Sequence, residues 1–256
     1  MRAIDEALAA ARVGKSSRLV IRGEPGIGKT ALLEYAVAHA GAMRVMSARG
    51  VEFEAGVPFA GLHELLRPAV GSIDRLTPVH AAALRSSLGL GERIEADRLI
   101  VGAAVLDLVA AYAEDAPLLL TIDDAQWFDR ASAEAIAFAA RRLIADPVAV
   151  LVAIRASEDS PLLAAGLDEL TVGGLDATEA IDLLKTLAAR ELPRDVLQRL
   201  VSETGGNPLA MLELARSDRP LSDHHDLPVA TSVERAYLRR ADGLSADRLP
   251  VARWLG

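Results

Sequence analysis

The sequence contains no cysteine, which excludes disulfides, thiolate metal sites and cysteine nucleophiles together. Its five histidines are scattered and show no metal-ligand spacing. Lysine is scarce, because Lys15, Lys29 and Lys185 are the only ones and arginine supplies the remaining positive charge. Asn207 is the sole asparagine, so the Asn-Lys-x-Asp motif that reads guanine cannot occur. We therefore do not expect GTP specificity of the usual kind.

Long apolar runs are also missing. The longest apolar stretch, residues 99–113, is interrupted by Asp107 and is shorter than the roughly 20 residues that span a bilayer. Asp5 and Glu6 stand near the N-terminus, where a secretory signal needs basic and then apolar residues. These features predict a cytoplasmic protein that makes no contact with a membrane.

The charge balance argues against nucleic-acid binding by this chain alone. The formal net charge is −8, and the arginines are spread among acidic residues and form no basic run. Release of counterions would then contribute little to affinity for DNA. With 256 residues, 51% of them hydrophobic, the chain can form one large domain with an appendage or two modest domains.

A glycine-rich loop carries the strongest functional signal. Residues 23–30 match the Gly-x4-Gly-Lys-Ser/Thr pattern of a P-loop, and one of only three lysines fills the required position. In such a loop the backbone N–H groups and the helix N-terminus hold phosphates, the lysine reaches the β- and γ-phosphates, and the hydroxyl ligates Mg²⁺. We therefore expect ATP and Mg²⁺ as ligands. The expected contacts to ATP come from Gly23, Glu24, Pro25, Gly26, Ile27, Gly28, Lys29, Thr30 and Ala31.

The pattern of elements predicts an α/β fold. Short β-rich or fully apolar runs at residues 18–22, 43–48, 118–122, 148–154 and 169–172 are typical of strands, and helical patterns separate them. This alternation predicts a five-stranded parallel sheet sandwiched by helices, the P-loop NTPase (ASCE/AAA+-like) arrangement. After residue 173 the strands stop, and three helical patterns predict a small C-terminal helical lid.

Three polar residues follow the later strands. Asp123 comes directly after an unbroken apolar run, where a second Mg²⁺-side carboxylate is required. Asp124 can polarise the attacking water as a general base. Arg155 ends the next strand, where it can contact the γ-phosphate or act as an ordinary solvated cation. We expect catalytic roles for Lys29, Asp124 and Arg155, and Mg²⁺ ligands in Thr30 and Asp123.

Several segments together resemble the STAND ATPases, and among them the large ATP-binding regulators of the LuxR type. They are the P-loop, the acidic run at residues 123–129, the strand end at 153–155, and residues 205–210, which read Gly-Gly-Asn-Pro-Leu-Ala. Residues 56–68 are similar to a further segment of those regulators. The resemblance implies a cytoplasmic, ATP-dependent switch in transcription regulation, with the nucleotide between the sheet domain and the lid.

The resemblance also implies that Pro208 packs near the adenine. Residues 205–208 equally fit a helix stop followed by an asparagine N-cap and a first-turn proline, and both interpretations can hold. The expected organisation is a P-loop ATPase domain over residues 1–173 and a lid over 174–217. Residues 218–256 are expected to form a linker and the start of a further helical, winged-helix-like region.

Two departures from the family pattern are visible. The Gly-Arg-Glu-type segment before the first helix is missing, and no C-terminal helix-turn-helix is recognisable. We therefore expect a fragment or a truncated relative without direct DNA binding. Self-association, or contact with further C-terminal domains, remains open.

The leading hypothesis is a slowly hydrolysing regulatory ATPase. A motor-type AAA+ or RecA-like ATPase would need an arginine finger supplied in trans, and no feature identifies one. A scaffold that binds ATP without turnover is a third reading, which Asp124 disfavours. A small-molecule kinase shares the P-loop but fits the Asp pair and the lid less well.

Overall fold

The computed structural model describes residues 1–94, 97–187 and 193–216. They divide into two compact units, one formed by Met1–Glu24 with Lys29–Val172 and the other by Pro25–Gly28 with the residues from Gly173 onward. No helix in the described part of the chain is both long and apolar enough to cross a membrane. The linker and further helical region expected over residues 218–256, with helical patterns at 232–242 and 246–255, lie outside the described residues.

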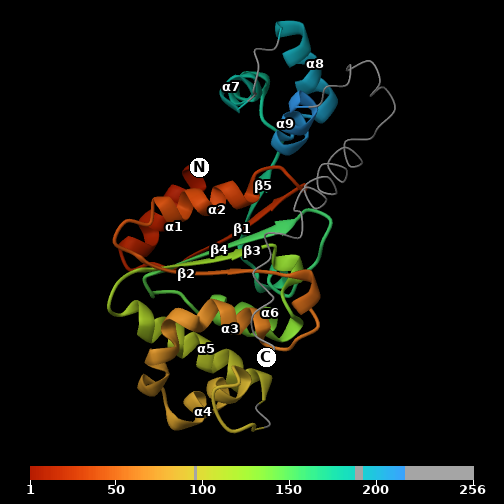
Figure 1. Ribbon diagram of the computed structural model, residues 1–256. Helices are drawn as coiled ribbons and strands as arrows, with labels where there is room; N and C mark the ends of the chain where they lie inside the picture. The colour runs from red at the N-terminus through yellow and green to blue at the C-terminus, as the bar shows by residue number, and fades with distance from the viewer. Residues whose placement is uncertain (95–96, 188–192, 217–256) are drawn as a thin grey trace, which may run out of the picture. The chain divides into compact units, whose positions relative to one another are not determined.

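The first unit is built on a five-stranded parallel sheet in the order β2-β3-β4-β1-β5 (Figure 1). The prediction of a parallel α/β fold is therefore confirmed. Its strands are β1 (Ser17–Gly23), β2 (Arg44–Arg49), β3 (Leu118–Asp123), β4 (Val148–Arg155) and β5 (Asp168–Val172). Both β3 and β4 are buried along almost their whole length, as their unbroken apolar sequences require.

Helices cover both faces of this sheet (Figure 1). One face packs against α1 (Arg2–Arg12) and α2 (Lys29–Ala38). The opposite face packs against α3 (Ala60–Leu66), α5 (Arg98–Ala113) and α6 (Arg130–Ala140), and α4 (Pro78–Ser87) lies against α5. Successive strand residues alternate between the two faces: Leu119 and Leu151 join the first core, while Leu120 and Val150 join the second.

Short connections complete the first unit. A 3-10 turn, η1 (Glu52–Glu54), lies between β2 and α3, and a longer one, η2 (Arg67–Arg75), continues from α3. Two more, η3 (Ala125–Trp127) and η4 (Leu163–Ala165), follow β3 and β4. The turn η3 directly follows Asp124 and therefore belongs to the edge of the sheet where the functional residues gather.

The second unit is helical in its described residues. It contains α7 (Ala177–Leu187), α8 (Arg194–Thr204) and α9 (Pro208–Arg216), which share a small core that includes Leu184, Leu200 and Met211. Gly205 ends α8 in the left-handed conformation, with φ of 57°, and the Asn207 side chain caps α9. The helix stop and N-cap that the Gly-Gly-Asn-Pro sequence suggests are thus both present.

Candidate functional site

The carboxyl ends of the parallel strands bring the polar residues together. In the sheet register Gly23 at the end of β1 stands beside Arg155 at the end of β4, and Arg49 at the end of β2 stands beside Asp123 at the end of β3. Ligands of open α/β sheets bind at this edge. Sequence positions far apart are therefore assembled into one site by strand order alone.

The glycine loop runs from β1 into α2, the context that a P-loop requires. Gly26 and Gly28 have φ of 76° and 104°, a region that favours glycine. Lys29 opens α2, and its Nζ donates to the carbonyl oxygens of Gly23 at 2.8 Å and Glu24 at 2.9 Å. With 8% of its surface exposed, Lys29 is a buried cation held over the loop by backbone carbonyls.

Burial lowers the pKa of Lys29 from its ordinary value of 10.5, because desolvation disfavours the ammonium ion. The charge of Asp124 opposes this shift, and the positive charge of Arg155 adds to it. Asp123 and Glu24 also favour the protonated form, with smaller effects. These five groups therefore share one electrostatic environment.

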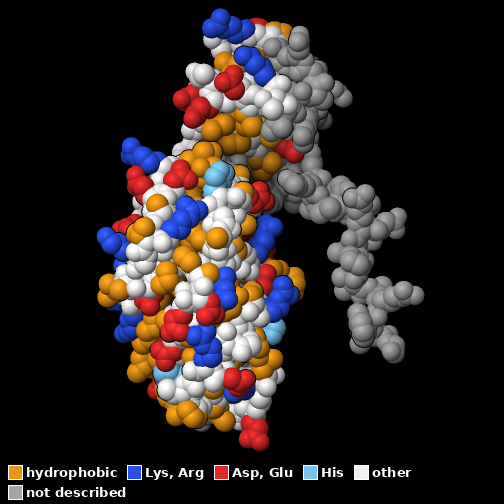
Figure 2. Space-filling model, turned by 90° about the vertical axis from the view of Figure 1, so that its left-hand side faces the viewer, with side chains coloured by type: hydrophobic (Ala, Val, Ile, Leu, Met, Phe, Trp, Pro, Cys, Tyr) orange, Lys and Arg blue, Asp and Glu red, His pale blue; other side chains and the backbone are white. Residues whose placement is uncertain are grey.

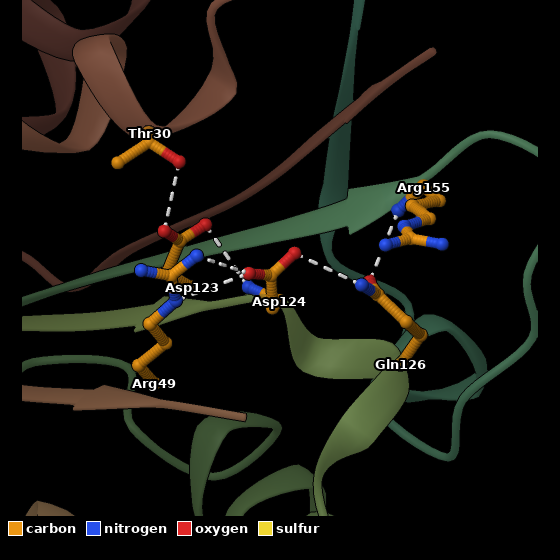
Figure 3. Close-up of polar contacts among 6 residues, drawn as sticks. All are labelled: Thr30, Arg49, Asp123, Asp124, Gln126 and Arg155. Carbon is orange, nitrogen blue, oxygen red and sulfur yellow. Dashed lines mark hydrogen bonds and ion pairs between the residues drawn. The ribbon is translucent and has the colours of Figure 1, made fainter. Parts of the chain in front are cut away.

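Thr30 and Asp123 connect the loop to the second acidic strand. The Thr30 hydroxyl donates to Asp123 Oδ2 at 2.8 Å, and Asp123 Oδ1 accepts the backbone N–H of Asp124 at 2.9 Å (Figure 3). A hydroxyl and a carboxylate are oxygen ligands of the kind that Mg²⁺ prefers, and Mg²⁺ commonly takes only one or two such ligands from protein with phosphates and water completing the shell. The two residues fit that donor set. Nowhere in the described ranges do three or more His, Cys, Asp or Glu side chains gather around a common point, so a dedicated all-protein cage is not formed there.

The Asp124 carboxylate accepts hydrogen bonds from two side chains, one at each of its oxygens. Arg49 donates from Nε at 3.1 Å and from Nη2 at 2.9 Å to Asp124 Oδ2, while Gln126 Nε2 donates to Oδ1 at 3.0 Å (Figure 3). The backbone of Asp124 is left-handed, with φ of 48°, which aspartate tolerates better than most residues. Both carboxylate oxygens are thus engaged in this conformation.

Gln126 continues the network to Arg155. Its Oε1 accepts the backbone N–H of Arg155 at 3.3 Å (Figure 3). The Arg155 guanidinium also lies 5.6 Å from the centre of the Trp127 ring. Each carboxamide end of Gln126 therefore contacts a different strand terminus. The side chain fixes the distance between the acid after β3 and the arginine that ends β4.

The residues predicted from the sequence to form the site lie in three parts of the structure. Glu24, Pro25 and Ile27 belong to the loop itself, with Ile27 buried, whereas Ala31 is exposed in the first turn of α2. Pro208 opens α9 in the helical unit. Lys29, Asp123, Asp124 and Arg155 form the cluster at the carboxyl edge of the sheet.

Sequence reasoning assigned no role to Arg49 or Gln126. Arg49 ends a strand, as Arg155 does, but only the pairing of β2 with β3 places it opposite Asp123, and strand order is not visible in local sequence. Gln126 follows the acidic pair by two positions, which is a spacing that many surface glutamines share. The signal available in both cases was a polar residue at or just beyond a strand end.

Comparison with protein families gives one match, an AAA ATPase domain, over residues 1–154. This covers more than half of the chain, so the protein belongs to the AAA ATPase domain family. Comparison with curated protein sequences finds no match.

Solved structures show the same fold at low sequence identity. A STAND protein with a tetratricopeptide repeat sensor from Pyrococcus horikoshii is 18% identical, with a TM-score of 0.57, over 92% of this chain and 32% of that one. A Walker-type ATPase of Pyrococcus abyssi is 16% identical, with a TM-score of 0.52, over 95% of this chain and 71% of that one. A Thermotoga maritima RuvB variant is 17% identical, with a TM-score of 0.50, over 93% and 67% of the two chains. The chain thus spans about a third of the length of the STAND protein.

Proposed function

We propose that this chain is the ATP-binding and slowly hydrolysing module of a regulatory switch. The observation that carries the proposal is the 2.8 Å hydrogen bond between Thr30 and Asp123, because it joins the P-loop to the acid of a separate strand at one point. A hydroxyl and a carboxylate so placed would hold Mg²⁺ against the phosphates, and the ion would supply charge neutralisation when bound. Membership of the AAA ATPase domain family supports the same reading.

The residues of the chain divide the remaining work. The loop N–H groups and the α2 N-terminus would bind the phosphates, and Lys29 would exchange its bonds to the Gly23 and Glu24 carbonyls for phosphate oxygens. Asp124 would take the proton of the attacking water, and Arg155 would stabilise charge on the γ-phosphate. Asp124 Oδ2 accepts both bonds from Arg49, whereas Oδ1 accepts one bond from Gln126 and keeps a lone pair for the attacking water. These bonds to protein donors lower the basicity of the carboxylate, which supports slow hydrolysis.

The biological setting is a further part of the proposal. We place the module in a cytoplasmic transcriptional regulator of the LuxR type, in which ATP and ADP favour different positions of the lid, and with Pro208 beside the adenine. The support is the resemblance of the Gly-Gly-Asn-Pro segment, the acidic run and residues 56–68 to that family, together with the fold shared with a STAND protein. A nucleotide can shift such a switch only by the difference in its affinity for the two states.

A scaffold that binds ATP without turnover is the second candidate. The specific observation in its favour is that both oxygens of Asp124 accept hydrogen bonds from protein side chains. A phosphate-release assay separates the two functions, since only the hydrolysing module releases phosphate above the level of a Lys29→Ala variant.

Thermal unfolding tests the shared element of both candidates. At about 100 times Kd, Mg-ATP should add roughly 2.7 kcal/mol to the native state, a rise on the order of 5–10 °C in Tm. Lys29→Ala should remove most of that rise, whereas Lys15→Ala, at an exposed lysine elsewhere, should retain it. An equal rise in both variants would refute the site.

A further inference from the structure

The first turn of α9 is hydrogen-bonded to the tip of the glycine loop. Asn207 Nδ2 donates to the Pro25 carbonyl at 2.9 Å, and the backbone N–H of Leu209 donates to the Gly26 carbonyl at 3.3 Å. Pro25–Gly28 and the residues from Gly173 onward form one compact unit, so these bonds lie within it. Two consecutive carbonyls of the loop are therefore fixed by one helix end.

Asn207 performs two tasks that only a carboxamide combines. Its Oδ1 accepts the N–H groups of Leu209 at 3.1 Å and Ala210 at 3.2 Å, which caps α9, and its Nδ2 remains for Pro25. The partners fix the orientation of the amide, because the oxygen faces two donors and the nitrogen faces an acceptor. Aspartate or serine would cap the helix equally well but would not supply this donor. Asn207 is 3% exposed and is the only asparagine of the chain.

The bond to Pro25 has a consequence for the next N–H group. A trans peptide is planar, with its carbonyl and the following N–H on opposite sides. Holding the carbonyls of Pro25 and Gly26 toward α9 therefore turns the N–H groups of Gly26 and Ile27 to the opposite side of the loop. Successive N–H groups turned the same way form an anion-binding concavity.

Gly26 shows how closely α9 approaches the loop. A Cβ at Gly26 would lie 2.6 Å from Leu209 Cβ and 3.1 Å from Asn207 Oδ1. Glycine is thus needed at this position for two reasons, the contact with α9 and the φ of 76°. The packing leaves the loop tip little freedom to rotate its peptides while α9 is in contact.

We propose that Asn207 is a positioning residue for the phosphate-binding loop: it holds the Pro25 carbonyl so that the N–H groups of Gly26 and Ile27 are oriented for a polyphosphate. The inference rests on the proposed nucleotide site. It assigns to Asn207 an effect on the phosphates, whereas the family resemblance concerns its neighbour Pro208 and the adenine. Because binding equilibria are reciprocal, a bound polyphosphate would in turn strengthen the contact between α9 and the loop.

The decisive variant is Asn207→Ser, which keeps a capping oxygen for α9 but is too short to donate to Pro25. Asp176→Ala is the matched control, because Asp176 caps α7 through Thr178 and Glu179 and so weakens the same unit without touching the loop. In the ligand-free full chain, we expect the amide chemical shifts of Gly26 and Ile27 to change in Asn207→Ser and to stay unchanged in Asp176→Ala. In titrations, we expect Asn207→Ser to bind Mg-ATP and Mg-bound inorganic triphosphate about fivefold more weakly, the loss typical of one neutral hydrogen bond.

Unchanged amide shifts at the loop, or equal changes in Asn207→Ser and Asp176→Ala, would overturn the inference. A loss confined to ATP, with inorganic triphosphate binding unaltered, would also overturn it, since Asn207 would then act on the nucleoside. If Lys29→Ala loses Mg-ATP while Asn207→Ser binds it as tightly as the unchanged chain, the proposed function stands and this inference fails. If neither the unchanged chain nor any variant binds nucleotide but the amide shifts change in Asn207→Ser alone, the positioning of the loop stands and the proposed function fails.

Discussion

At the scale of single residues, the backbone conformation around Asp124 is tightly restricted. Asp124 lies in the left-handed region, and a Cβ added at Gly50 would lie 2.2 Å from its carbonyl oxygen. Gly50 N–H also donates to the Asp123 carbonyl at 2.8 Å. The end of β2 therefore holds the acidic turn by its backbone as well as through Arg49, and the two carboxylates are presented in different directions.

The two acids should separate by role. Mg²⁺ should tighten ATP binding by a factor about tenfold smaller in Asp123→Asn than in the unchanged chain, because the metal site would lose its anionic ligand. Asp124→Asn should leave ATP bound and lower phosphate release by about 100-fold or more, the usual contribution of a general base. Asp168→Asn, at an exposed position of β5, serves as the control for the loss of one negative charge. Unchanged turnover in Asp124→Asn would show that another group activates the attacking water.

The lowered pKa of Lys29 predicts that the free energy of unfolding depends on pH. Its pKa is lower in the folded chain than the value of 10.5 for the exposed group, so between the two values the unfolded state binds more protons and the free energy of unfolding rises with pH. The cost of burying the ammonium ion is complete below the folded pKa and is relieved as pH rises through it. In melts from about pH 7 to about pH 10, the unchanged ligand-free chain should gain stability relative to Lys29→Met. A gain by the variant instead would show that the ammonium is stabilised by its carbonyl partners.

At the scale of elements, Asp129 joins two helix starts. It is 3% exposed, and its carboxylate accepts the N–H groups of Phe59 at 2.8 Å, Gly61 at 3.1 Å and Ser132 at 2.9 Å. The last bond caps α6, and the first two hold the start of α3, where Phe59 has a left-handed φ of 66°. The acidic run that begins with Asp123 is thus fixed to the β2–α3 connection at its far end too.

Asp129→Ala should therefore be strongly destabilising. One buried and two partly buried N–H groups would lose their acceptor, and we expect a loss on the order of 3–5 kcal/mol in the free energy of unfolding. Asp97→Ala is the comparison, because Asp97 caps α5 at an exposed site with a single 2.8 Å bond from Leu99 and should cost about 1 kcal/mol. Denaturant titration of both variants measures the difference. Equal losses would show that Asp129 acts as a helix cap alone.

Prediction from the sequence succeeded where the signal was local. The unbroken apolar runs at residues 118–122 and 148–154 identify β3 and β4 because a strand buried on both faces can contain little else. The helix α1 was not predicted, although its buried residues Ile4, Ala7, Leu8 and Ala11 recur at helical spacing. Contacts such as Arg49 with Asp124 depend on strand order, and the bond from Asn207 to Pro25 depends on tertiary packing, so neither has a local signature.

At the scale of the whole molecule, several basic side chains are paired with acidic ones. Figure 2 shows basic and acidic side chains interspersed over the described part of the face drawn. Many arginines have a carboxylate partner within 4 Å, among them Arg22, Arg44, Arg49, Arg75, Arg85, Arg98, Arg130 and Arg199. The net charge of −8 adds a general repulsion toward polyanions beyond the loop.

We expect no sequence-specific DNA binding by this chain alone. The cluster of Arg235, Arg239 and Arg240 lies outside the described residues, and three arginines would release few counterions, so any weak binding should disappear near physiological salt. Fluorescence anisotropy at about 150 mM salt measures this, with non-specific Kd values expected at about 10⁻⁴–10⁻⁶ M or weaker. Sub-micromolar binding that distinguishes one sequence from another would contradict the expectation.

The bond between Asn207 and Pro25 also bears on how the chain folds. It joins positions 182 apart, so the loop leaves the ribosome long before the helix that completes it. Closing so long a connection is slow compared with forming the local helices, and we expect it among the last events of folding. A nascent chain that ends before α9 would then contain β1, the glycine loop and α2 without the bonds that orient the loop. The orientation of the loop by these bonds would then be acquired only after α9 has left the ribosome.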